Sequence, residues 1–401
     1  MGLEVEEYID MANKCFNPED YQRAIANCNQ ALRLQPDNAA AYFQRGKAHY
    51  YLGEITSAIN DYTQALRIDP NFAQAYNNRG NARSQLGDKQ GAISDYTQAL
   101  KINPNDAYAY NNRGVALSHL GEITAAINDY THAISINSSL AYAYNNRGKA
   151  LSHLGEITAA INDYTQALNI DPDFATAYYL RGLLRYYLED HQGAIADYTQ
   201  ALKINPNYAL AYYNRGLALS DLGDHQGAIA DYTQALKINP NYALAYYNRG
   251  LALSDLGDHQ GAIADYTQAL KINPDDADAY NNRGNARCEL EDYQGAIADY
   301  TQALKINPDD ADAYNNRGSA LYYLDDNQGA IADYIQALKI NPNYPSAYYN
   351  RGLALYDLGD HQGAINDWKA AAYIYQKAGD EISFQYAVDK IALVSPNDSI
   401  N

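Results

Sequence analysis

The amino-acid sequence predicts an all-α fold, an α-solenoid of about eleven tandem helix-turn-helix repeats. The first observation is self-similarity, because the string AYYNRGLALSDLGDHQGAIADYTQALKINP at 211–240 occurs again, unchanged, at 245–274. The second is composition: 41 tyrosines against a single tryptophan among 401 residues is a bias that a repeated motif produces. The third is that 47% of the residues are hydrophobic, enough to bury a large core, and that they recur at helical spacing. Together these observations indicate units that stack on their neighbours and bury a continuous core.

The repeat period is 34 residues. Variants of the string start at Ala41, Ala75, Ala109, Ala143, Ala177, Ala279, Ala313 and Ala347. If each unit starts two residues before that alanine, a divergent first unit precedes ten regular ones. The predicted units are 5–38, 39–72, 73–106, 107–140, 141–174, 175–208, 209–242, 243–276, 277–310, 311–344 and 345–378. Residues 379–401 follow as a solvating helix and tail, in which Ile382, Val388 and Ile391 are expected to face the last hairpin.

Each unit is predicted to form two helices. In 209–242 the first helix should span about 211–222, with Leu222 on its inward stripe, and the second about 226–238. Gly223 favours a left-handed helix end, and Asp224 favours capping of the second helix. The pair Asn239-Pro240 then ends that helix and starts the turn to the next unit.

These residues resemble the tetratricopeptide repeat (TPR) family. Its characteristic aromatic, Gly, Ala, aromatic, Ala and Pro positions are occupied in 209–242 by Tyr212, Gly216, Ala228, Tyr232, Ala235 and Pro240. The variant is similar to the form common in cyanobacterial proteins. The resemblance implies a right-handed superhelix whose first helices line a concave groove, and a function in binding other proteins.

Composition narrows the possible functions. A formal net charge of −19 repels phosphate backbones and argues against nucleic-acid binding. No apolar run approaches the length of a membrane span, and the first residues lack the pattern of a secretory signal. The three cysteines form no CxxC pair, and Cys15 and Cys28 are expected in the core of the first unit. We therefore expect a cytoplasmic protein without membrane insertion.

Arginine stands at the seventh place of ten units, and an aspartate stands sixteen residues later in the same ten. The first unit has Met11 and Asn27 instead. This joint loss predicts a set of Arg–Asp ion pairs between the two helices of each unit. The alternative is an arginine-lined groove for anionic ligands. The arginines are Arg45, Arg79, Arg113, Arg147, Arg181, Arg215, Arg249, Arg283, Arg317 and Arg351.

Asparagine dominates the sixth place of the first helix. A side-chain amide carries both a donor and an acceptor, so a row of them matches the backbone of an extended polypeptide. The alternative is that these amides only solvate the groove. The predicted peptide-binding asparagines are Asn78, Asn112, Asn146, Asn214, Asn248, Asn282, Asn316 and Asn350.

Tyrosines and one irregular unit complete the predicted binding surface. Tyr179, Tyr213 and Tyr247 hold the fifth place, where several other units have asparagine, and offer large contact area. Unit 175–208 departs most from the pattern and is predicted to hold a binding hot spot. Sequence drift or a local bend explains it equally well. Its unusual residues include Leu180, Arg185, Tyr186 and Tyr187.

No catalytic pattern stands out from the repeated background. The eight histidines fall at recurring places, and no phosphate-binding, metalloprotease or hydrolase motif is present. We expect no cofactor, no metal site and no enzymatic activity. The predicted function is a scaffold that binds a protein or peptide in its groove. The alternative is a structural spacer or a rod that self-associates.

Overall fold

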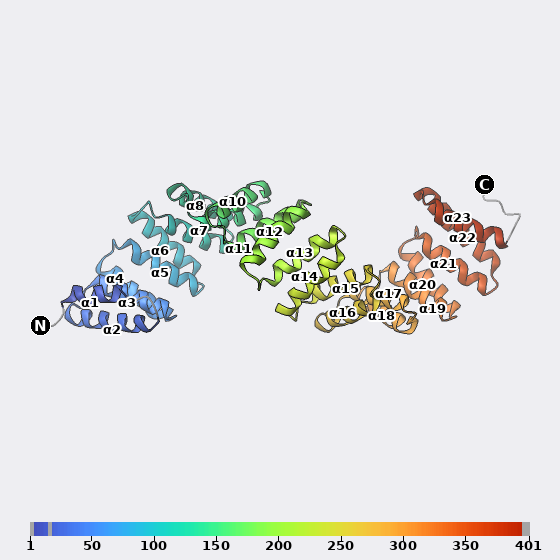
Figure 1. Ribbon diagram of the computed structural model, residues 1–401, viewed down its shortest axis with the longest axis horizontal. Coiled ribbons are helices and arrows are strands. Elements are labelled where there is room, and N and C mark those ends of the chain that lie inside the picture. Colours follow the sequence, from blue (N-terminus) through green and yellow to red (C-terminus); the bar gives the residue numbers. More distant parts are fainter. Residues whose placement is uncertain (1–3, 15–17, 395–401) are drawn as a thin grey trace. The chain divides into compact units, whose positions relative to one another are not determined.

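The computed structural model describes residues 4–14 and 18–394, and all regular secondary structure in these two ranges is α-helical. Two compact parts, Met1–Asn205 and Pro206–Asn401, make up the chain. We call them the first unit and the second unit, and each is built from several 34-residue repeats. Within each unit the helices follow one another as packed pairs (Figure 1). Cys15 and the tail at 395–401 lie outside the described residues.

The first unit holds twelve helices in its described part. They are α1 (Val5–Asn13), α2 (Pro18–Leu34), α3 (Ala39–Tyr51), α4 (Ile55–Ile68), α5 (Ala73–Gln85), α6 (Lys89–Ile102), α7 (Ala107–His119), α8 (Ile123–Ile136), α9 (Ala141–His153), α10 (Ile157–Ile170), α11 (Ala175–Tyr187) and α12 (His191–Ile204).

The second unit holds eleven helices up to residue 394. They are α13 (Ala209–Asp221), α14 (His225–Ile238), α15 (Ala243–Asp255), α16 (His259–Ile272), α17 (Ala277–Glu289), α18 (Tyr293–Ile306), α19 (Ala311–Tyr323), α20 (Asn327–Ile340), α21 (Pro345–Asp357), α22 (His361–Ala378) and α23 (Glu381–Val394).

The turn between α13 and α14 follows from one glycine and one aspartate. After α13, Gly223 has a φ of 79°, a left-handed conformation that a residue with a Cβ adopts at a cost. The Asp224 carboxylate then accepts the Gly227 N–H at 2.9 Å and caps α14. The prediction for Leu222 was wrong: α13 ends one residue earlier, and Leu222 is the helix cap with 45% of its surface exposed.

Small residues and one tyrosine per pair form the core. In α14 the side chains of Ala228, Tyr232 and Ala235 are fully buried. The Tyr232 ring lies against the backbone of α13 at Gly216, where an added Cβ would be 2.6 Å from the ring. Glycine at this place therefore permits the close approach of the two helices.

Ion pairs also join the two helices, as the sequence predicted. In all ten pairs from α3–α4 to α21–α22, the arginine Nε and Nη2 atoms donate to both oxygens of the aspartate. The aspartates are buried. The hydrogen bonding of Arg113 to the Asp129 carboxylate is the largest cause of the raised pKa of Arg113. Since the guanidinium groups are occupied in this way, the alternative of an arginine-lined groove is wrong.

The last hairpin carries an additional helix. In α22 the fully buried Trp368 replaces the repeated tyrosine, and its ring N–H donates to the Tyr349 carbonyl at 3.2 Å. Ile391 of α23 is buried against this hairpin, as expected. The expectation for Ile382 was wrong, because it is 72% exposed on the other side of α23.

Candidate functional site

Cavities open along the first helices of the first unit, between neighbouring pairs. A cavity of about 410 Å³ is lined from α5 and α7 by residues that include Asn81, Gln85 and Asn112. A second one of about 420 Å³ is lined by the equivalent side chains one pair further, including Ser118 and Asn146. With each 34-residue repeat numbered from its first residue, places 6, 9, 12 and 13 of the first helices line these two cavities. We call the surface formed by places 2, 5, 6, 9, 12 and 13 of the first helices the groove face.

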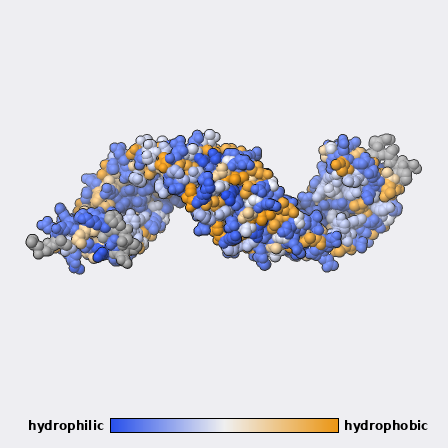
Figure 2. All heavy atoms as spheres, viewed as in Figure 1, coloured by the Kyte–Doolittle hydropathy of each residue, from blue (hydrophilic) through white to orange (hydrophobic). Residues whose placement is uncertain are grey.

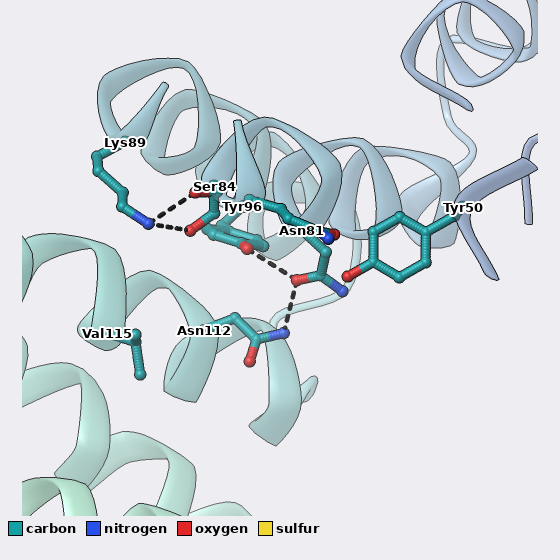
Figure 3. Close-up of a pocket in the computed structure, with 8 residues that line it drawn as sticks. Tyr50, Asn81, Ser84, Lys89, Tyr96, Asn112 and Val115 are labelled. Atoms are coloured by element: carbon teal, nitrogen blue, oxygen red, sulfur yellow. Dashed lines mark hydrogen bonds between the residues drawn. The ribbon is translucent and has the colours of Figure 1, made fainter. Parts of the chain in front are cut away.

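A hydrogen-bonded group of three side chains forms the wall of the first cavity (Figure 3). The Asn81 Oδ1 atom accepts the hydroxyl proton of Tyr96 at 2.8 Å and an N–H of Asn112 at 3.1 Å. Beside it, the Lys89 Nζ atom donates to the carbonyl and hydroxyl oxygens of Ser84. Burial raises the pKa of Tyr96 well above its ordinary value, so its hydroxyl stays a donor at neutral pH.

The second unit repeats this group. There Asn285 accepts from the Tyr300 hydroxyl at 2.7 Å and from Asn316 at 3.2 Å. The members come from the same three places as in the first unit, namely the second-helix tyrosine, place 9, and place 6 of the next pair. The arrangement is thus a property of the repeat wherever place 9 carries an asparagine.

All eight predicted asparagines are half-buried on the groove face. Asn146 donates to Asn111 of the preceding pair at 3.0 Å, and Asn350 donates to Asn315 at 3.2 Å. Asn248 and Asn282 donate to tyrosine hydroxyl oxygens of the preceding pair, at 3.0 and 2.9 Å. Asn78 is a hydrogen-bond partner of Tyr62. Asn214 donates to the carbonyl of Leu210 within its own helix.

These bonds give most of the asparagines a second role that sequence reasoning missed. They join consecutive pairs and hold the amides in fixed orientations. A carboxamide has two N–H groups and an oxygen with two lone pairs, so one inter-repeat bond leaves hydrogen-bonding capacity for a ligand. One feature of the sequence could have indicated these bonds. Place 5 is asparagine or tyrosine in nine of the ten regular repeats and so supplies a hydrogen-bond acceptor for the next repeat.

The predicted tyrosines differ in what they offer. Tyr213 and Tyr247 are half-buried, with their rings packed on Tyr232 and Tyr266. Tyr179 is only 9% exposed and packs on Tyr198, so it contributes to the core and offers little surface to a ligand.

The residues that make unit 175–208 unusual are distributed over three environments. Tyr187 is 73% exposed, whereas Tyr186 is half-buried with its ring against His191. Arg185 donates to the buried Asp197 at 3.0 Å and is therefore part of the framework. Leu180 is half-buried in α11.

Three place-5 asparagines have a buried side-chain oxygen without a partner, namely Asn77, Asn145 and Asn281. After Asn77 and Asn281 the next place-6 asparagine donates to place 9 instead, whereas after Asn145 the next place 6 is Leu180. At place 6 it cannot donate to place 5 of the preceding pair, as Asn146 and Asn350 do. The side-chain oxygen of Asn145 at that place is buried and has no hydrogen-bond partner in the structure. An unsatisfied buried carbonyl costs about 1–3 kcal/mol. The first unit therefore carries a local defect in its asparagine row at α11.

The charges on the groove face are distributed unevenly between the two units. At its six places in α3, α5, α7, α9 and α11, Lys47 and Lys149 are the charged residues, besides histidines. In α13, α15, α17, α19 and α21 the charged residues are all acidic. They are Asp221, Asp255, Asp278, Glu289, Asp312 and Asp357.

The described part of the groove face carries no cluster of metal-binding side chains. No group of three or more His, Cys, Asp or Glu side chains that could hold a metal ion occurs within residues 4–14 and 18–394. No helix in this part of the chain is both long enough and apolar enough to cross a bilayer. What the surface offers is amides, hydroxyls, aromatic rings and, in the second unit, leucines and carboxylates.

Comparison with known proteins identifies the repeat. A family model described as the TPR repeat matches residues 12–53, 46–87, 117–155, 153–188, 284–325 and 318–359. Models described as the tetratricopeptide repeat match 73–106, 95–128, 179–243, 213–277, 265–298 and 345–380.

Curated relatives match over a short segment. Tetratricopeptide repeat protein 4 of Mus musculus is 36% identical over 62 residues, and that of Homo sapiens is 37% identical over 62 residues. These matches cover 14% of this chain and 16% of each relative.

Among solved structures, YrrB is described as a TPR protein with an unusual peptide-binding site. It is 28% identical, with a TM-score of 0.44, over 46% of this chain and 95% of its own. The APC/C hetero-tetramer Cut9–Hcn1 is 15% identical, with a TM-score of 0.47, over 98% of this chain and 97% of that chain. Since the TPR repeat model alone matches more than half of the residues, the chain belongs to the tetratricopeptide repeat family.

Proposed function

We propose that the protein is a non-enzymatic scaffold that binds a segment of another polypeptide along its groove face. TPR repeats are typical of protein–protein interaction, and proteins built from them generally act without catalysis. The finer proposal concerns the surface that is used. It consists of the asparagine row, together with Tyr213 and Tyr247 and, in unit 175–208, Leu180, Tyr186 and Tyr187. We further propose that the protein is located in the cytoplasm.

The observation that carries this proposal is the fixed orientation of the asparagines. Free surface amides lose side-chain entropy when they bind a ligand, which weakens binding. Here Asn112, Asn146, Asn248, Asn282, Asn316 and Asn350 are already held by bonds to the preceding pair. Cavities beside Asn112 and Asn146 leave room for a ligand's side chains. A polypeptide backbone can use the remaining N–H groups and oxygens at little further entropic cost.

The test combines Asn214→Ala, Asn248→Ala and Asn282→Ala in the full chain and measures binding to a peptide array. Alanine also removes the inter-repeat bonds of Asn248 and Asn282, so a matched control is needed. Tyr213→Phe with Tyr247→Phe removes those same two bonds but keeps the amides. We expect the alanine variant to lose captured peptides and the phenylalanine variant to retain them. Equal capture by wild type and the alanine variant would reject the asparagine row as a binding surface.

A second candidate function is self-association, favoured by one face of α23. Ile382, Tyr386 and Leu393 are each more than 60% exposed on this helix. Three exposed large hydrophobic side chains on a single helix are typical of a contact surface. Replacing all three with serine should lower the mass measured by light scattering if the chain associates through α23. An unchanged mass would leave the groove face as the candidate surface.

A further inference from the structure

The groove face of the second unit carries leucine or tyrosine at three of its six places in each of two consecutive pairs. At places 2, 5 and 9, α13 carries Leu210, Tyr213 and Leu217, and α15 carries Leu244, Tyr247 and Leu251. These places are separated by three or four residues, so the side chains lie along one face of each helix. We call these six residues the leucine patch.

The leucine patch is only partly covered by the protein itself. Leu210 and Leu244 are 46% and 53% exposed. Leu217 and Leu251 are half-buried. Figure 2 shows hydrophobic residues gathered over α13 to α15. In α17 and α19 the corresponding places hold Asp278, Asn281 and Asn285, then Asp312, Asn315 and Ser319, so the repeat does not require leucine there. Exposed apolar surface that the fold does not need indicates a contact with something else.

Carboxylates lie next to the leucine patch. Asp278 and Asp276 are close enough to the Tyr247 hydroxyl to raise its pKa, although burial is the larger cause. The Asp255 carboxylate at the end of α15 is more than half exposed and lies 3.6 Å from the His225 ring. Glu289 at the end of α17 is exposed. The groove face of α13–α21 has no lysine or arginine at any of its six places.

We propose that the leucine patch binds a basic, apolar polypeptide segment, in which leucine-like side chains alternate with lysine or arginine. Leucine and tyrosine side chains supply apolar contact, and the carboxylates around them select a cation and disfavour an acidic segment. A second copy of this chain is a poor occupant, because its net charge of −19 would bring like charges together. This inference rests on the proposed function and adds the chemistry of the partner.

The experiment measures binding of three short synthetic peptides to the full chain by fluorescence anisotropy. The first alternates leucine with lysine, the second has glutamate in place of every lysine, and the third has serine in place of every leucine. We expect the leucine–lysine peptide to bind tightest. Its affinity should fall as salt rises, because the carboxylates are exposed and their attraction is screened.

Two variants test the two halves of the patch separately. Leu217→Asn with Leu251→Asn should weaken the leucine–lysine peptide by about tenfold. Asparagine is tolerated at this place, as Asn285 shows. The matched control is Ile238→Asn with Ile272→Asn, which changes exposed residues at the ends of α14 and α16. Asp255→Asn, Asp278→Asn and Glu289→Gln together should weaken the same peptide several-fold at low salt, whereas Asp37→Asn with Asp173→Asn in exposed loops should not.

The outcomes separate this inference from the function on which it rests. Tighter binding of the leucine–lysine peptide, with losses in both groove variants and in neither control, supports it. Equal binding of the lysine and glutamate peptides would overturn it, as would losses in the controls equal to those in the groove variants. If the peptide array captures ligands but the leucine–lysine peptide does not bind, the inference fails and the proposed function stands. If no peptide binds anywhere, both fail.

Discussion

The two units of the chain use the same framework to present different surfaces. In both, a bidentate Arg–Asp pair fixes the two helices of each regular repeat, and a glycine admits the buried aromatic ring. On the groove face, the first unit has lysines and histidines beside its asparagines, whereas the second has leucines and carboxylates. Because the arginine and the glycine of the framework stand at places 7 and 8, outside the six places of the groove face, those six places vary between repeats while the framework is kept.

The framework explains how near-identical repeats keep one register. In most pairs the arginine also donates to a side chain of the preceding pair. Arg113 donates to the Thr97 hydroxyl at 3.1 Å, and Arg249 donates to the Thr233 hydroxyl at 2.9 Å. The guanidinium group therefore joins three helices, and its neighbouring tyrosine stacks on it at about 5.5 Å. An arrangement that needs all these partners at once disfavours a shifted register.

The largest expected effect comes from breaking this framework in either unit. Asp129→Asn in the first unit and Asp231→Asn in the second each leave a partly buried guanidinium group without its charge partner. We expect a loss of about 3–5 kcal/mol of local stability in both cases. Amide hydrogen exchange in α7–α8 and in α13–α14 measures it, because a repeat chain opens locally.

The control for this prediction is Asp275→Asn, an exposed residue outside the framework. Its exchange rates should stay close to those of the wild type. If the two framework variants differ from each other by as much as either differs from the wild type, then the units do not share one framework, and the comparison fails.

A smaller effect should distinguish places with and without an asparagine at place 9. Tyr96→Phe and Tyr300→Phe each remove a hydroxyl that donates to an asparagine. The expected cost is about 1 kcal/mol. Tyr266→Phe is the matched control, since Leu251 at its place 9 offers no acceptor. Urea or thermal unfolding followed by circular dichroism should rank Tyr266→Phe as the mildest of the three, and any other ranking contradicts the assigned hydrogen bonds.

The sequence predicted the framework well because its residues change together. Arg and Asp appear together in ten 34-residue repeats and are both absent from repeat 5–38. This predicts their pairing, and the structure confirms it. The turn at Gly223 and Asp224 followed from local backbone chemistry. These features depend on contacts within one repeat, for which the period supplies ten examples.

Features that depend on two different repeats were harder to predict. For Asn248 the sequence predicts ligand binding or solvation of the groove. Its bond to Tyr213 is not predicted, because it joins residues 35 apart that only the stacking brings together. Exposure at the ends of helices was also misjudged. Leu222 and Ile382 fit a helical stripe, but the first caps its helix and the second lies on the far side of α23. Periodicity gives the face of a helix and not where the helix ends or which face is covered.

The defect in the asparagine row at α11 provides a stabilising prediction. Leu180→Asn restores a donor opposite the unpartnered side-chain oxygen of Asn145. The gain should be below about 1 kcal/mol, because the half-buried leucine also loses apolar contact. Leu180→Ala, which loses the contact without adding a donor, is the control and should destabilise. If Leu180→Asn is no more stable than Leu180→Ala, the unpaired oxygen is not what limits this repeat. Loss of captured peptides in Leu180→Asn would support a hot spot in unit 175–208.

The smallest expected effect is a difference in thiol pKa at place 12 between the two units. Place 12 holds Cys288 in the second unit and Ser118 in the first. Burial is the main cause that raises the pKa of the Cys288 thiol, and Glu289 and Asp292 raise it further. The equivalent Ser118 of the first unit lines a cavity with Lys149 and His119. A thiol reacts with iodoacetamide as its thiolate, so a raised pKa slows alkylation at neutral pH, and the rate grows as pH rises through that pKa.

The measurement compares alkylation of Cys288 with that of a thiol introduced by Ser118→Cys. Cys15 and Cys28 are changed to alanine in both proteins, and Cys288 is changed to serine in the second. We expect the thiol of the first unit to react faster at neutral pH, with a rate that levels off at a lower pH. The leucine–lysine peptide should protect Cys288 alone, because the leucine patch lies in the second unit. Equal rates would mean that neither burial nor the nearby carboxylates slow the reaction of Cys288, and the charge argument for a basic partner would lose this support.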